Sequence, residues 1–173
     1  KALPQIDGIV GVGRLPQLRD MILGRTKAAY CVREMPRVSI RTPLPRKRLN
    51  SQPHSFLKIA DGCNHKCTFC SIPLMKGGYV SVSPDILLAE AERLLKEGIK
   101  ELNLVAQDIS RYGIDRWKHY RLPDLLTELS SLSGDFWIRC LYCYPNSVDS
   151  RLLATIAEQP KIVPYLDVPF QHV

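Results

Sequence analysis

Three cysteines in one short stretch are the residues of this chain best placed for chemistry. Cys63, Cys67 and Cys70 lie in segment 57–78, LKIADGCNHKCTFCSIPLMKGG, at the spacing C-x3-C-x2-C. A short apolar run precedes them and then breaks, so they are expected on a loop. Thiolates this close together on a loop can converge on one ion or cluster, and soft thiolates select zinc, copper(I) or iron–sulfur clusters.

The spacing alone leaves four kinds of site open. A disulfide would leave one cysteine over, and nothing else marks a secreted scaffold. A structural zinc site requires a fourth protein ligand, which His65 could supply only by turning its ring back into a crowded loop. Cys67-Thr-Phe-Cys70 is a C-x-x-C of the redox type, but that reading leaves Cys63 unexplained. A 4Fe-4S cluster usually takes four thiolates, so three would leave one iron open for a substrate.

Alternating strands and helices are predicted from position 55 onward. The strands are expected over 55–60, 100–107, 136–142 and 162–168, with helices from Ser83 to Gly98, along Leu122, Leu125, Leu126, Leu129 and Leu132, and over 147–159. This alternation implies a parallel sheet with helical cover, closed into a barrel or wound as an open sheet. Functional residues of such folds gather at the C-terminal ends of the strands, and the cysteine loop and Gln107-Asp108 both follow predicted strands.

The chain before position 54 has a different character. Residues 1–23 predict a short strand at Ile9-Val10 and a helix with apolar residues at helical spacing. Residues 33–53 form a linker, because four prolines interrupt regular structure. Six arginines and lysines there suit a solvated segment or, alternatively, an electrostatic contact with RNA. Cys31 is expected to be an ordinary packing residue.

Composition indicates one globular domain. The chain has 173 residues, of which 45% are hydrophobic and 24% charged, with a net charge of +7. It contains no apolar run of about 18 residues, so no membrane span is predicted. Without a signal pattern, the irregularly spaced cysteines suit the cytoplasm. Because position 1 is not methionine, an excerpt of a longer protein is expected.

The remaining cysteines and histidines are expected to be structural. Cys140 lies in the predicted strand 136–142 and Cys143 directly follows it, and in a strand that runs through both, a separation of three places their side chains on opposite faces. They are therefore predicted to be packing residues rather than a metal pair. His54 and His119 have no partner at ligand spacing and are predicted to lie on the surface.

The chain resembles the radical S-adenosylmethionine (SAM) enzymes, whose signature is C-x3-C-x-aromatic-C after a strand, with Phe69 as the aromatic. Further motifs resemble the methylthiotransferases of that superfamily, namely Gly62-Cys63-Asn64-His65, Ile72-Pro73, Gly77, Ala106-Gln107-Asp108, Tyr112-Gly113 with Asp115, Tyr144-Pro145, Tyr165-Leu166-Asp167 and Gln171-His172. Three of these motifs resemble the RimO branch, which modifies an aspartate of a ribosomal protein, rather than the tRNA-modifying MiaB branch.

The resemblance implies an α/β fold, a partial (β/α) barrel of the radical SAM type with four of six strands present. Residues 1–32 would be the tail of the N-terminal methylthiotransferase domain, 33–53 a basic linker and 54–173 a truncated radical SAM core. The family's N-terminal domain holds a second 4Fe-4S cluster, whose cysteines are absent here. This excerpt is therefore not expected to complete methylthiolation.

The resemblance also implies cofactors and partners. Cys63, Cys67 and Cys70 would hold a 4Fe-4S cluster whose fourth iron binds SAM, with Phe69 against the adenine and Gln107 and Asp108 near the SAM amino group. The implied reaction adds a methylthio group to the β-carbon of an aspartate in a small-subunit ribosomal protein, with electrons from an unidentified donor. The RNA that the basic linker could contact would then be ribosomal RNA. Alternatives are a tRNA adenosine methylthiotransferase or a non-catalytic, metal-bearing module that binds RNA or the ribosome.

Overall fold

The computed structural model describes residues 8–11, 15–26 and 52–170. Helix α1 (Leu15–Ile22) confirms the helix predicted near the N-terminus, whereas Ile9 and Val10 belong to no strand, so that prediction was wrong. Cys31 and nearly all of the predicted linker lie outside the described residues. No helix in the described ranges combines the length and the apolar character needed to cross a bilayer.

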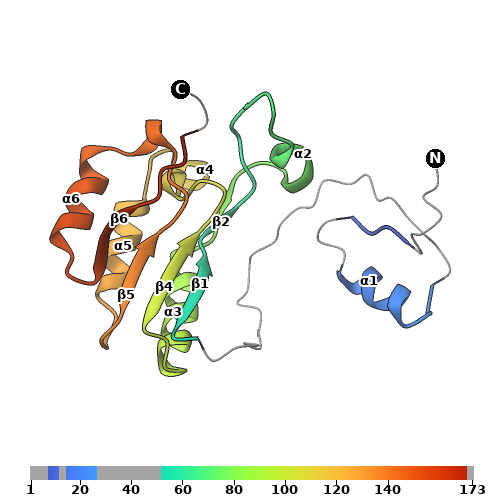
Figure 1. The fold of residues 1–173 in the computed structure, drawn as a ribbon, viewed down its shortest axis with the longest axis horizontal. Helices are drawn as coiled ribbons and strands as arrows, with labels where there is room; N and C mark the ends of the chain where they lie inside the picture. The colour runs from blue at the N-terminus through green and yellow to red at the C-terminus, as the bar shows by residue number, and fades with distance from the viewer. Residues whose placement is uncertain (1–7, 12–14, 27–51, 171–173) are drawn as a thin grey trace.

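A parallel sheet of four strands forms the centre of the fold (Figure 1). The strands β1 (His54–Lys58), β4 (Glu101–Val105), β5 (Trp137–Cys140) and β6 (Ile162–Leu166) follow one another across the sheet in that order. Every neighbouring pair is parallel, with Leu57 beside Leu104 and Leu104 beside Cys140 in the register. The α/β class and the four strands predicted from the sequence are therefore confirmed.

Three amphipathic helices connect the strands and cover the sheet (Figure 1). They are α3 (Pro84–Lys96), α5 (Leu122–Ser130) and α6 (Ser150–Glu158). Ser83, where the helix was predicted to begin, stands at the N-cap of α3, but its side chain makes no capping bond. At the start of α6, by contrast, the Asp149 side chain does form a cap, because its carboxylate accepts from the backbone N–H of Leu152 at 2.8 Å.

The buried faces of these helices meet the sheet in one hydrophobic core. Leu94 of α3, Leu104 of β4 and Leu126 of α5 have no exposed surface. Burying such a side chain stabilises the fold by about 1.5–3 kcal/mol, so this core supplies most of the driving force for folding. Leu153 is apolar but 49% exposed, because α6 buries only a narrow stripe that includes Leu152 and Ile156.

The first predicted strand is divided between two sheets. Residues 55–60 were expected as one strand, but β1 ends at Lys58 and the chain then enters β2 (Ala60–Asp61), which pairs antiparallel with β3 (Val80–Ser81). Ile59 makes the transition, since its N–H donates to the Val105 carbonyl at 3.0 Å and its own carbonyl accepts from Val82 at 2.8 Å. The small sheet thus closes the base of the cysteine loop.

The other three predicted strands end about two residues earlier than expected. Short helical segments follow two of them, namely η1 (Ile109–Arg111) and α4 (Ile114–Trp117) after β4, and η2 (Pro145–Ser147) after β5. The carboxylate of Asp108 accepts from the backbone N–H of Ser110 at 3.1 Å, so a side chain replaces the strand ladder there. These early ends decide which side chains reach the functional edge of the sheet.

Candidate functional site

The cysteine loop begins with a turn that requires glycine. Gly62 has φ +76°, and a Cβ added to it would lie 2.2 Å from the Gly78 carbonyl oxygen and 2.7 Å from that of Gly77. The next residue continues this close approach, since the N–H of Cys63 donates to the Gly77 carbonyl at 3.1 Å. The two ends of the loop are thereby held together, which positions Cys63 at the end of β2.

A buried carboxylate anchors the same turn. Asp61 is 4% exposed and pairs with Lys58 and, at 3.4 Å, with Lys76. Burial alone would raise the pKa of this carboxyl, but the hydrogen bond and charge of Lys58, the backbone N–H of Gly62 and the charge of Lys76 outweigh it and hold the pKa below its ordinary value. The anchor joins β1, the loop and helix α2 (Ile72–Lys76).

A cavity of about 360 Å³ lies at the strand ends and brings most of the predicted site residues together. Cys63, Cys67, Phe69, Cys70 and Gln107 all line it. Its volume is within the range of small-molecule sites. The loop after β1 and the segment after β4 therefore meet at one place, as the position of motifs at the C-terminal ends of parallel strands predicts.

The three cysteines differ in their surroundings. Cys63 is buried, whereas Cys67 and Cys70 are partly exposed, and all three are free thiols. Burial raises the pKa of the Cys63 thiol, although the backbone N–H of His65, which donates to Cys63 Sγ at 3.4 Å, opposes that effect. No three His, Cys, Asp or Glu side chains of the described ranges already stand close enough together to hold a metal ion. Cluster ligation by these cysteines stays a prediction.

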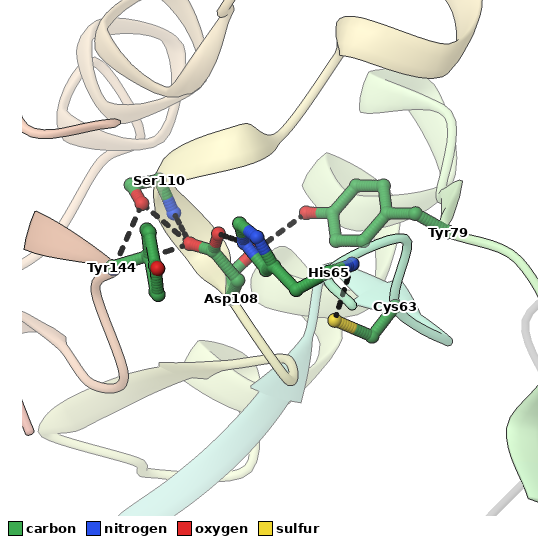
Figure 2. A network of polar contacts seen from close by, with 6 residues as sticks. All are labelled: Cys63, His65, Tyr79, Asp108, Ser110 and Tyr144. Carbon is green, nitrogen blue, oxygen red and sulfur yellow. Dashed lines mark hydrogen bonds and ion pairs between the residues drawn. The ribbon is translucent and has the colours of Figure 1, made fainter. Parts of the chain in front are cut away.

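Asp108 does not line the cavity, although it is the neighbour of Gln107. Its side chain is 2% exposed, and both carboxylate oxygens accept hydrogen bonds from the protein (Figure 2). Oδ2 is 2.9 Å from Nε2 of His65, and Oδ1 accepts from Ser110 and from the backbone N–H of Tyr144. Of Gln107 and Asp108, only Gln107 lines the cavity. The predicted contact of Asp108 with the SAM amino group stays a prediction.

The network around Asp108 joins three separate strand ends (Figure 2). His65 comes from the cysteine loop, Asp108 follows β4, and Tyr144 follows β5. The rings of His65 and Tyr144 stack with centroids 4.1 Å apart, and both residues line the cavity. Tyr79 adds a further bond, because its hydroxyl donates to the Asp108 carbonyl at 2.8 Å. Sequence reasoning identified the separate motifs but not these contacts.

Cys143 is a cavity residue that the sequence analysis assigned to packing alone. The prediction placed it inside a strand with Cys140, but β5 ends at Cys140 and Cys143 lies beyond it. Cys140 is fully buried, as predicted. Cys143 is also buried, and burial raises the pKa of its thiol to about 12, but it lines the cavity with the three loop cysteines. Cys143 reaches the cavity because the strand ends early at Cys140, and the sequence did not predict that early end.

The end of β6 also reaches this edge of the sheet. Asp167 follows β6, its carbonyl accepts from Cys143 at 2.8 Å, and its carboxylate accepts from the Tyr142 N–H at 3.3 Å. Tyr142 has φ +66°, an uncommon conformation for tyrosine that turns the chain out of the strand, and 49% of its surface is exposed at the cavity. The predicted motif residues Gln171 and His172 lie outside the described residues.

The two histidines predicted to be surface residues have no role at this site. His119 is exposed, and its Nδ1 is 2.9 Å from the Trp117 carbonyl. His54 is partly buried in β1 and packs edge-on against the exposed Phe56. Neither lines the cavity.

The donor set at the cavity suits an iron–sulfur cluster. Three thiols from one loop line the same space, and soft ligands of this kind select such clusters. Oε1 of Gln107 is buried and has no hydrogen-bond partner in the part of the chain that the structure describes. An orphaned buried acceptor is costly and requires an explanation, which a donor group of a bound ligand would supply.

Comparison with known proteins agrees with this arrangement. Residues 57–131 match the radical SAM superfamily. Two solved structures of the radical SAM methyltransferase TsrM from Kitasatospora setae share its fold. The structure with cobalamin and a [4Fe-4S] cluster bound matches with a TM-score of 0.53 and 17% identity, and the match covers 68% of this chain and 22% of that chain. The structure with tryptophan and a SAM analogue bound matches with a TM-score of 0.54 and 17% identity, and the match covers 69% of this chain and 22% of that chain.

Closer relatives confirm the resemblance to the RimO branch. Proteins named ribosomal protein uS12 methylthiotransferase RimO are 37% identical in Desulfitobacterium hafniense and 42% identical in Moorella thermoacetica and in Thermotoga maritima. The first two matches cover 98% of this chain and the third covers 99%. The chain spans 39% of the length of each of these relatives.

Proposed function

We propose that Cys63, Cys67 and Cys70 hold a 4Fe-4S cluster and that SAM binds beside it in the cavity. The observation that carries this proposal is the meeting of all three thiols with the unpartnered Gln107 oxygen around one space. Three protein thiolates leave one iron free for a ligand, which is the arrangement that SAM needs. Such a cluster, once bound and reduced, would supply the electron that cleaves the sulfonium of SAM.

The chain's own residues bind and orient the reactants. Gln107 can accept a hydrogen bond from the amino group of SAM through its buried Oε1. Phe69 is 71% exposed and lines the cavity, so its ring is available to pack on the adenine. Much of the cavity lining is apolar, as at Phe69, Ile72 and Pro169, and an apolar lining limits side reactions of a radical.

We further propose that the whole protein adds a methylthio group to the β-carbon of an aspartate in ribosomal protein uS12. The support is the similarity to proteins with that printed name along almost the entire chain. The motifs that distinguish the branch come from three strand ends, and Asp108, Tyr144 and Asp167 lie in one bonded region there. Motifs that lie at the same end of a parallel sheet contribute to one substrate pocket.

Cluster binding is tested by anaerobic reconstitution with iron and sulfide. The protein should take up about four irons, and the triple variant with Cys63, Cys67 and Cys70 changed to Ala should take up none. Cys140→Ala is the matched control, because this buried thiol belongs to the core and does not line the cavity. Retention of iron by the triple variant, or uptake of a single zinc by the wild type, would refute the assignment.

A tRNA adenosine is the second candidate substrate. Tyr142 is half exposed at the cavity and offers a surface on which a purine could stack. Mass spectrometry of ribosomal proteins and of tRNA from a strain that lacks the gene separates the two candidates. Loss of the methylthio mass from uS12 supports the proposal, whereas loss from tRNA with uS12 unchanged reverses it.

A further inference from the structure

Asp108 is a buried carboxylate that accepts hydrogen bonds from three parts of the chain. Its Oδ1 accepts from the Ser110 hydroxyl, from the Ser110 N–H at 3.1 Å and from the Tyr144 N–H at 3.3 Å. Its Oδ2 is left for His65, whose Nε2 lies 2.9 Å away. In the described ranges, the salt bridges of Asp108 involve neither lysine nor arginine, so His65 is its one ionisable partner.

This arrangement fixes where the His65 ring carries a proton. A carboxylate can only accept, so Nε2 of His65 must donate, whether the ring is neutral or charged. The ring is also held by its stack on Tyr144 at 4.1 Å, and Tyr144 is itself bonded to Asp108 through its backbone. One carboxylate therefore sets both rings, which come from different strand ends and line the cavity together (Figure 2).

We propose that Asp108 is a positioning residue: acting through His65, it fixes the His65–Tyr144 stack as the wall of the cavity that orients the target side chain for hydrogen abstraction. The inference rests on the proposed function and names the part of the site that holds the substrate. It assigns the cofactor to the three cysteines and Gln107, and the target aspartate to the His65–Tyr144 stack, which lines the same cavity.

Two simpler roles fit the geometry less well. A direct contact of Asp108 with SAM would require a carboxylate that is 2% exposed to leave four protein donors. Ligation of a metal by His65 through Nε2 would break the bond to Asp108 and leave a buried charge unpaired, which is costly. Both residues are better placed to hold the wall than to bind the cofactor.

The replacement Asp108→Asn tests this role because it leaves no group unpaired but exchanges the charge-assisted bond to His65 for a weaker neutral one, which holds the ring less firmly. The Asn oxygen can take the place of Oδ1, where three donors converge, so its NH₂ group faces His65. Nε2 must then accept, which moves the ring proton to Nδ1. Tyr144→Leu is the second variant, because it removes the stack but keeps the backbone N–H bonded to Asp108. His119→Ala, an exposed histidine away from the cavity, is the control.

The experiment uses the full-length protein with reconstituted clusters, SAM, a reductant, a sulfide source and uS12. It measures methylthiolated uS12 per 5′-deoxyadenosine formed, together with the electron paramagnetic resonance signal of the reduced cluster before and after SAM is added. We expect both variants to keep the wild-type spectra and most of their SAM cleavage, while methylthiolated product falls about 10- to 100-fold, the cost of misplacing a reacting group. His119→Ala should match the wild type.

Each other outcome decides against the inference. If SAM cleavage and product fall in parallel with a changed SAM-dependent spectrum, Asp108 supports the cofactor site and not a substrate wall. If product per 5′-deoxyadenosine is unchanged in both variants, the wall does not orient the target. If the wild type itself cleaves SAM but never modifies uS12, the proposed substrate fails, and the inference fails with it for that separate reason.

Discussion

The turn at Gly62 gives the sharpest test of how the fold positions the cysteine loop. We expect Gly62→Ala to destabilise the protein through two separate effects. The first is the left-handed backbone at φ +76°, which costs a residue with a Cβ about 1–2 kcal/mol. The second is the clash of that Cβ with backbone oxygens, the nearest of which is 2.2 Å away.

The second effect is the larger one. A contact of 2.2 Å cannot persist, so the loop must move away from the Gly78 carbonyl and break the bond from the Cys63 N–H to Gly77. Leaving those buried groups unpaired adds about 1–3 kcal/mol. The total loss is therefore about 2–5 kcal/mol, a large fraction of the 5–15 kcal/mol that typically stabilises a folded protein.

Gly98→Ala separates the two effects. Gly98 also has a positive φ, +88°, but a Cβ there meets nothing within 4 Å. This variant should lose only the conformational term of about 1–2 kcal/mol. Urea unfolding followed by the fluorescence of Trp117 and Trp137 gives both free energies from midpoints at a constant slope. If Gly62→Ala loses no more than Gly98→Ala, the close approach of the loop ends is not what holds the turn.

Two further changes test the anchor of the loop and the core. Asp61→Asn should lower the free energy of unfolding near neutral pH, because Lys58 and Lys76 hold the pKa of this carboxyl below 3.8. A lowered pKa stabilises the native state at pH values above the ordinary pKa, and this stabilisation is lost as the pH falls through the folded-state pKa. The urea midpoints of wild type and variant should therefore converge in acid and not in base. Leu94→Ala should cost about 2–5 kcal/mol by opening a cavity in the core, whereas Leu153→Ala, at a position 49% exposed, should cost less than about 1 kcal/mol; thermal midpoints that shift equally would contradict the burial assigned to these two leucines.

The sequence by itself determined the order and type of the main elements. The strand and helix patterns after position 55 predicted four parallel strands and three covering helices, because burial of one helical face or a whole strand leaves a clear apolar period. It also determined the cysteine loop, since the C-x3-C-x2-C spacing is local and needs no folding to be recognised. The predicted helix boundaries are less accurate for α6, which begins at Ser150 rather than at position 147.

Only the tertiary structure decided where each strand ends. The residues after Val105 and Cys140 look like continuing strand, because Ala106 and Leu141 are apolar. Backbone groups there leave the ladder for contacts with other loops, as when the Ile109 N–H donates to the Tyr142 carbonyl at 3.0 Å. Such bonds depend on which loops the sheet brings together, and no local pattern encodes them. The wrong assignment of Cys143 to a strand follows directly from this.

The contacts that join His65, Asp108 and Tyr144 were likewise decided by the fold alone. His65 and Asp108 are 43 positions apart, and Asp108 and Tyr144 are 36 apart. The sequence places these residues in three separate motifs, but nothing local indicates that their side chains meet. Parallel strands place their C-terminal ends along one edge of a sheet, so three loops that are distant along the chain arrive at the same point. A short-range pattern can name the residues that follow each strand, but the pairing of their side chains depends on the register and twist of the strands that carry them.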